Sequence, residues 1–166
     1  VMFELKKISP EGVSEAIEKA ERYRLLNEPR LAESICLDIL EVDPANNKAI
    51  VIMLLAITDE FNSSSPADVN EARQLLPRLS NEYERNYYGG IICERKGKSL
   101  LGKNIPEGIY IIYEWLSDAM ELYEKAETLR PAGNDDALLR WNTCARLITR
   151  YRLEPRDEKY IEPELE

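Results

Sequence analysis

The chain has 166 residues, of which 44% are hydrophobic and 32% charged. This is the size of one globular domain or of a short array of helical repeats. Its 31 acidic and 22 basic residues give a net charge of −9, which argues against a nucleic-acid partner because phosphates favour basic surfaces. Histidine is absent, so the usual general base, the usual zinc ligand and histidine-activated nucleophiles are excluded. We therefore expect a non-enzymatic protein with no metal and no other cofactor.

The three cysteines, Cys36, Cys93 and Cys144, stand more than fifty residues apart and form no pair with the spacing of a zinc or redox motif. They lie on apolar stripes, and we expect small buried core residues with reduced thiols. The longest apolar run, residues 49–57, is too short to span a bilayer, and the first residues have no signal-peptide core. These features predict a soluble, cytoplasmic protein without a membrane partner.

The apolar residues predict an all-α fold, because they recur with a period of about 3.6 and nowhere alternate as in a half-buried strand. Ser9 and Pro10 provide an N-cap and a first-turn proline for the first helix. Asp43-Pro44 ends the second helix, and the third is apolar nearly all round, as in a helix packed on both sides. We expect these three helices over residues 10–26, 29–42 and 47–61.

The second half of the chain predicts four more helices, over residues 66–79, 81–98, 108–129 and 134–151. Residues 65–68 supply the cap of the fourth, and Pro77 is expected to kink it. The sixth helix would be about 33 Å long. Residues 152–166 contain two prolines and six acids against three bases, which favours an extended or disordered acidic tail. The expected organisation is an N-terminal extension (1–9), a helical domain (10–151) and this tail.

Two stretches of the chain repeat one pattern without gaps. The shared offsets are 0, 4, 7 and 12, and the residues are Ala32, Cys36, Ile39 and Pro44 in one stretch and Ala119, Tyr123, Ala126 and Pro131 in the other. Ala20 and Tyr23 stand where the preceding helix needs a small residue followed by a tyrosine. Small residues let helix axes approach closely, and the proline sets the following turn. This pattern resembles the tetratricopeptide repeat over residues 10–150.

The resemblance implies a right-handed α-solenoid of about three helix pairs plus a C-terminal capping helix. A weaker middle copy has Ala72, Leu76 and Leu79 at the first three offsets but Glu84 in place of the proline. The steps from Ala32 to Ala72 and from Ala72 to Ala119 are 40 and 47 residues, against 34 in the family. The second excess predicts lengthened helices in the last repeat.

By resemblance, such an array binds a peptide or protein segment in the concave groove lined by the first helix of each pair. The alignment assigns an aromatic and basic set to this groove: Arg24, Lys48, Asp59, Tyr87, Tyr88, Ile91, Arg95, Leu138, Asn142 and Arg146. Tyrosine and arginine are frequent interface hot spots, and arginine grips carboxylates. A ligand with an apolar segment and an acidic group would suit this set. The alternative for the two tyrosines is that one packs beneath the sixth helix.

Other functions stay open at this point. The clamp that binds chaperone tails in this family needs polar or basic residues where the first helix has Ile17, Glu18 and Glu21, so we do not predict that ligand. The sixth helix, residues 109–129, is apolar on two sides; either the fifth and seventh helices cover it, or the excess forms a homodimer contact. A secretion-type chaperone and an accessory domain of a partner enzyme are the alternatives to an interaction module.

Overall fold

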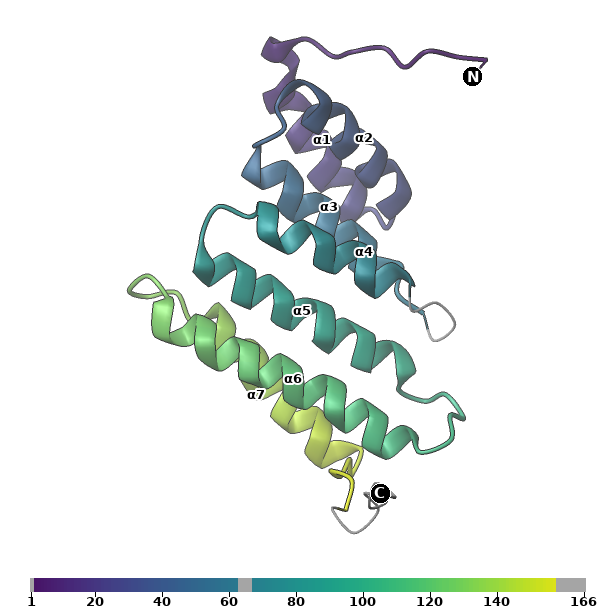
Figure 1. Cartoon of the computed structure of the whole chain (residues 1–166), viewed down its shortest axis with the longest axis vertical. Coiled ribbons are helices and arrows are strands. Elements are labelled where there is room, and N and C mark those ends of the chain that lie inside the picture. The colour runs from purple at the N-terminus through teal and green to yellow at the C-terminus, as the bar shows by residue number, and fades with distance from the viewer. Residues whose placement is uncertain (1, 63–66, 158–166) are drawn as a thin grey trace, which may run out of the picture.

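The computed structural model describes residues 2–62 and 67–157, and these form seven α-helices and no strand (Figure 1). The predicted all-α fold is thereby confirmed. The helices are α1 (Val13–Leu25), α2 (Pro29–Val42), α3 (Asn47–Asp59), α4 (Ala67–Leu75), α5 (Glu82–Leu100), α6 (Gly108–Leu129) and α7 (Asp136–Arg150). The predicted cap at residues 65–66 and the end of the predicted tail lie outside the described residues.

Side-chain caps fix several of these helix starts. Ser9 Oγ accepts a hydrogen bond from the Gly12 backbone N–H at 3.1 Å, at the start of a 3₁₀ turn (Pro10–Gly12) that leads into α1. Asn46 and Asn81 cap α3 and α5 in the same way, at 3.0 and 2.8 Å. Such caps satisfy backbone N–H groups that have no partner within the helix.

The fourth helix is shorter than the sequence predicts. It ends at Leu75 and is followed by a separate 3₁₀ turn, Leu76–Arg78, rather than continuing through a kink at Pro77. The physical reason is that proline lacks the backbone N–H and its ring collides with the preceding turn. Leu79 is nevertheless buried, at 3% exposure, so the predicted core position is correct although the residue lies outside the helix.

The helices pack in chain order into an elongated stack with the two chain ends at its opposite poles (Figure 1). Each of α1, α2 and α3 contacts the next helix, and α6 contacts both α5 and α7. The alternate helix α3 also contacts both α1 and α5 directly. This order is compatible with stacked helix pairs, and it places three odd-numbered helices side by side on one face.

Two apolar cores fill the stack. The N-terminal core joins α1 to α4 and includes Ile92 of α5, and the C-terminal core joins α5 to α7. Leu55, Tyr88 and Trp115 pack against both cores. The alanines of the repeat pattern are completely buried, as close helix packing requires: Ala20, Ala32, Ala72, Ala119 and Ala126.

The α5 and α6 helices are in close contact at Gly90. A Cβ atom at this position would lie only 2.4–2.9 Å from three ring carbons of Tyr123, so the α5–α6 contact requires glycine. α5 and α6 have 19 and 22 residues, against 13 or 14 in α1 to α3, which confirms the predicted lengthening. Because α6 packs against both α5 and α7, its large apolar side chains are mostly covered, and Ile109 and Leu129 at its two ends are about half exposed.

The chain continues past α7 as a strap, residues 151–157, that returns to the start of α6. Leu153 is only 7% exposed and belongs to the C-terminal core. Arg156 Nη1 donates to Glu107 Oε2 at 2.7 Å, and its Nε donates to Glu114 Oε1 at 3.3 Å. The first part of the predicted tail is therefore non-helical but anchored to α6. Within the described ranges, no helix combines the length and apolarity needed to cross a membrane.

Candidate functional site

The face formed by α1, α3 and α5 carries a chain of three charged residues, one from each helix. Asp59 near the end of α3 receives Arg24 from α1, with Nε 2.8 Å from Oδ2 and Nη2 donating to Oδ1 at 3.2 Å. Arg95 of α5 donates to the same Oδ1 and, at 3.0 Å, to the Thr58 hydroxyl. The three side chains are 20–23% exposed. Two guanidinium groups thus share one carboxylate, which leaves one positive charge in excess.

An apolar hollow of about 360 Å³ adjoins this ion pair, and we call it the groove pocket. Its walls come from the same three helices and consist of Glu21, Arg24, Leu25, Val51, Ile52, Leu55 and Tyr88. Leu25 is 80% exposed at the rim, although leucine is usually buried. Burial, followed by the neighbouring Tyr87, raises the pKa of Tyr88 to about 12, so its hydroxyl stays protonated at neutral pH and can donate a hydrogen bond.

A second carboxylate lies deeper, between α5 and α7. The Glu94 side chain is 1% exposed, and it contacts Arg140 Nη1 at 2.9 Å and Lys98 Nζ at 3.6 Å. The Tyr123 hydroxyl also donates to it, at 3.1 Å. Buried charges persist only when they are paired and hydrogen-bonded, and Glu94 meets both conditions. As at Asp59, two cations share one carboxylate.

A cluster of tyrosines links this buried carboxylate to the groove. The rings of Tyr83 and Tyr87 stack at 5.8 Å, and Tyr87 meets Tyr88 edge to face at 5.1 Å. The Tyr87 hydroxyl accepts a hydrogen bond from Arg140 Nε at 3.1 Å, and its ring lies 6.0 Å from that of Tyr123 on α6. These contacts hold the wall of the groove rigid, because aromatic pairs and hydrogen bonds fix the ring positions.

Four residues of the predicted groove set lie together on this face, because Asp59 joins Arg24 to Arg95, and Arg24 lines the groove pocket together with Tyr88. Tyr87 packs inward against Tyr123 of α6, which is the alternative considered for one of the two tyrosines. The placement of Ile91 in the groove is wrong. Its side chain is 1% exposed and belongs to the C-terminal core, since the long α5 is covered there by neighbouring helices.

The remaining predicted groove residues lie elsewhere. Lys48 is exposed in the first turn of α3, eleven residues and therefore about 16 Å from Asp59 along the helix. On α7, the contact with α5 is made by Arg140, two positions from both Leu138 and Asn142 and so on the opposite side of the helix. Arg146 lies in a shallow hollow made by α7 residues alone.

The prediction missed Glu94, Lys98 and Arg140. Glu94 stands beside Arg95 in a run of charged residues, and nothing in that run distinguishes a buried carboxylate from a solvated one. A usable signal was the spacing on α5, because Tyr87, Glu94 and Lys98 fall at offsets 0, 7 and 11, which share one helix face. An acid on a stripe that also contains tyrosine and faces another helix indicates a paired, buried charge.

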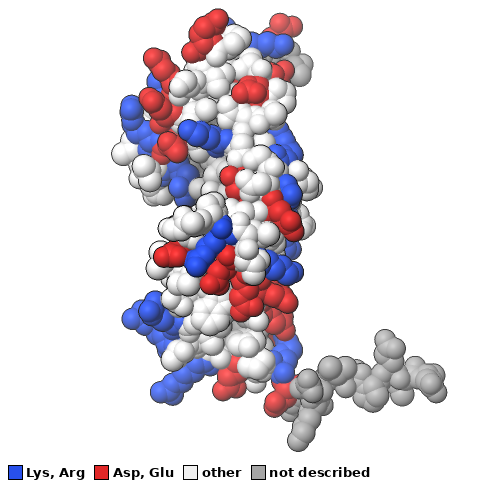
Figure 2. All heavy atoms as spheres, turned by 90° about the vertical axis from the view of Figure 1, so that its left-hand side faces the viewer, with Lys and Arg blue, Asp and Glu red and all other residues white. Residues whose placement is uncertain are grey.

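The charges elsewhere are mixed. On the side where the α4–α5 and α6–α7 connections lie, acidic and basic side chains are spread along the whole length of the molecule among uncharged residues (Figure 2). Cys36, Cys93 and Cys144 are all buried with free thiols, as predicted. Burial raises the pKa of Cys36 and of Cys144 to about 12, so these thiols are not nucleophiles at neutral pH.

A scan of protein-family models, a search of curated proteins and a search of solved structures each found no match to this chain.

Proposed function

We propose that this chain is a non-enzymatic interaction module that binds a peptide or protein segment on the face of α1, α3 and α5. The observation that carries the proposal is the sharing of Asp59 between Arg24 and Arg95 beside the apolar groove pocket. The resemblance to tetratricopeptide repeats, in which the corresponding face binds peptides, supports the same surface. The ligand would bring one large apolar side chain for the pocket and one carboxylate for the arginines.

The charge balance favours an acidic ligand. An Asp59 carboxylate with a single arginine would be neutral, whereas with two it leaves a positive charge in a partly desolvated position. A hydrogen bond from arginine to a carboxylate contributes about 1.5–3 kcal/mol, more than a neutral pair. Glu21 at the rim is exposed, and water and salt screen it more strongly than the half-buried arginines.

The apolar part of the ligand gains affinity by burial. Leu25, Val51 and Leu55 line the groove pocket without being fully buried, so they lose water when a side chain enters. A fully buried leucine or phenylalanine side chain contributes about 1.5–3 kcal/mol. One apolar side chain and one or two arginine–carboxylate hydrogen bonds contribute about 3–9 kcal/mol before the loss of ligand freedom is subtracted, whereas a micromolar complex needs about 8 kcal/mol net. A ligand limited to these contacts therefore binds weakly, and tighter binding needs additional contacts along the groove.

The experiment is a selection of random displayed peptides on the purified chain, followed by fluorescence anisotropy with the best synthetic peptide. Enriched peptides should combine Asp or Glu with a large apolar residue. Arg95→Gln leaves a neutral Arg24–Asp59 pair and should weaken binding about tenfold or more. Leu25→Ser should also weaken it, because it removes the apolar rim of the pocket.

The matched control is Leu26→Ser, which changes the neighbouring exposed leucine, 62% exposed and not in the groove pocket. It should bind the peptide like the unchanged chain. Replacing the acid of the peptide by its amide should abolish the difference between the unchanged chain and Arg95→Gln. If no peptide is enriched, or if both groove variants bind as well as the control, the groove is not the binding surface.

A further inference from the structure

The first residues of the chain form an extended arm, residues 2–7, that is exposed along its length. Met2, Phe3 and Leu5 are 88%, 77% and 92% exposed, among the highest values for large apolar side chains in the described ranges. Phe3 and Leu5 are two positions apart, so in an extended chain they face the same side. Ile8 packs on the N-terminal core and fixes where the arm leaves the domain. Such an apolar stripe normally marks a binding segment.

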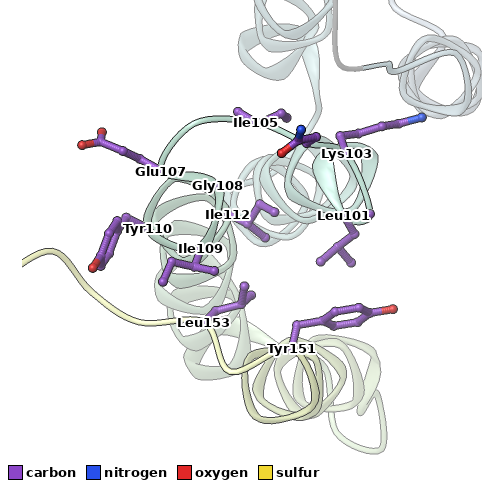
Figure 3. Close-up of a pocket in the computed structure, with 12 residues that line it drawn as sticks. Leu101, Lys103, Ile105, Glu107, Gly108, Ile109, Tyr110, Ile112, Tyr151 and Leu153 are labelled. Carbon is purple, nitrogen blue, oxygen red and sulfur yellow. The ribbon is translucent and has the colours of Figure 1, made fainter.

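The opposite end of the molecule has a complementary hollow, the end pocket, of about 540 Å³. It lies between the α5–α6 connection, the start of α6 and the strap. Figure 3 shows Leu101, Ile109, Ile112, Tyr151 and Leu153 surrounding one open space. Ile109 and Tyr151 are 42% and 46% exposed, so apolar side chains line a hollow that is open to solvent.

The arm of one molecule cannot fill its own end pocket. Six extended residues span at most about 20 Å. The arm lies at one pole of the stack and the end pocket at the other, with several helix layers of 8–10 Å each between them (Figure 1). The arm and the α5–α6 connection nevertheless project on the same side of the stack in this view. A second copy placed along the long axis would bring its end pocket to the arm of the first.

The charges near the two features are also complementary. On the α6 side of the end pocket, Glu107 and Glu114 share one cation, Arg156, which leaves one negative charge on that side. The arm brings Lys6 and Lys7 directly after its apolar stripe. On the other side of the pocket Lys103 has no ion pair within the described ranges, and Glu4 of the arm supplies the opposite charge.

We propose that the arm of one copy binds the end pocket of a second copy, so that the chains associate head to tail. Phe3 and Leu5 enter the pocket against Ile109 and Tyr151, and the lysines face Glu107 and Glu114. Such a contact uses different surfaces on the two partners, so each added copy leaves one free arm and one free pocket. Association therefore grows stepwise with concentration. This proposal does not depend on the groove.

The test is sedimentation velocity over a range of concentrations. The arm variant is Phe3→Ser with Leu5→Ser, whose side chains are exposed, and the pocket variant is Ile109→Lys. Matched controls are Leu26→Ser for the arm and, for the pocket, Leu129→Lys, an equally exposed leucine at the other end of α6. Circular dichroism and the melting temperature check folding. Tyr151→Lys serves as a second pocket variant if Ile109→Lys does not fold.

The unchanged chain and both controls should form larger species as concentration rises, while the arm and pocket variants remain monomers. An equimolar mixture of the two variants retains one working arm and one working pocket, and it should form a dimer and nothing larger. The proposal is overturned if the unchanged chain stays monomeric throughout, if the controls abolish association equally, or if the mixture gives no dimer.

Discussion

Gly89 and Gly90 are adjacent in the middle of α5, and replacing each by alanine separates two opposing effects. A glycine in a helix is about 0.8–1.0 kcal/mol less favourable than alanine, so both substitutions gain helix propensity. At Gly89 the new Cβ would lie 3.4 Å from a Leu122 methyl group, which is tolerable contact. We expect Gly89→Ala to leave the free energy of unfolding unchanged or to raise it by up to about 1 kcal/mol.

Gly90→Ala should behave in the opposite way. Its Cβ would lie 2.4 Å from a ring carbon of Tyr123, whose side chain is completely buried and cannot move outward freely. Overpacking of this kind destabilises by about 1–3 kcal/mol. Displacement of the ring also weakens the Tyr123–Glu94 hydrogen bond, and a bond to a charged group contributes about 1.5–3 kcal/mol. After the helix gain is subtracted, we expect a net loss of about 2–4 kcal/mol.

Urea unfolding followed by circular dichroism measures both variants under the same conditions. The melting temperature of Gly90→Ala should fall by roughly 5–15 °C, from about 2–4 °C per kcal/mol for a chain of this size. The double variant Gly90→Ala with Tyr123→Leu should be less destabilised than the sum of its parts, because the smaller side chain makes room. Equal stability of the two alanine variants would refute the close α5–α6 contact.

Three further outcomes follow from buried groups. Glu94→Gln should lower the free energy of unfolding, measured with urea, by about 2–4 kcal/mol, because it leaves Arg140 without its charged partner. The control Asp135→Asn breaks the exposed pair with Arg130 and should change this free energy by less than about 1 kcal/mol. Burial and the neighbouring Glu71 raise the pKa of Glu33, so the folded state binds more protons than the unfolded state just above pH 4.5. Glu33→Gln should therefore raise the free energy of unfolding at pH 7, and this gain should disappear as the pH falls toward 5. The urea midpoints of the variant and the unchanged chain at the two pH values measure this difference. Burial raises the pKa of the Cys36 and Cys144 thiols to about 12, so these thiols should not react with a thiol reagent at pH 8 until denaturant is added. Rapid labelling of the native chain would contradict their burial.

The sequence predicted the helices well because their signals are local. The cap at Ser9, the proline at position 44 and the 3.6-residue stripes act within a few residues of each helix end. Pro77 shows the limit of such signals, since a kink and a break into a 3₁₀ turn have the same local cause. Only the packing of the following segment decides between them.

The site was less predictable because it depends on how helices are rotated about their axes. Arg24 and Arg95 lie on the predicted face, and both come from the last turns of their helices, α1 and α5, where they meet Asp59 at the end of α3. On α7 an offset of two residues exchanged Arg140 for Leu138 and Asn142, since two positions correspond to about half a turn. Ile91 failed because no local pattern tells a covered helix face from an open one.

The Arg95–Asp59 contact also has a mechanical meaning. Asp59 ends α3 of the N-terminal core, and Arg95 belongs to α5, which contributes residues to both cores, so this ion pair ties α5 to α3 beside the place where the two cores join. A ligand carboxylate that draws Arg95 away from Asp59 breaks this ion pair, and one that bridges both arginines strengthens the link between α3 and α5. The angle between the N-terminal and C-terminal halves of the stack would then depend on which kind of ligand is bound. Scattering profiles of the Arg95→Gln chain should match those of the state in which the Arg95–Asp59 ion pair is broken.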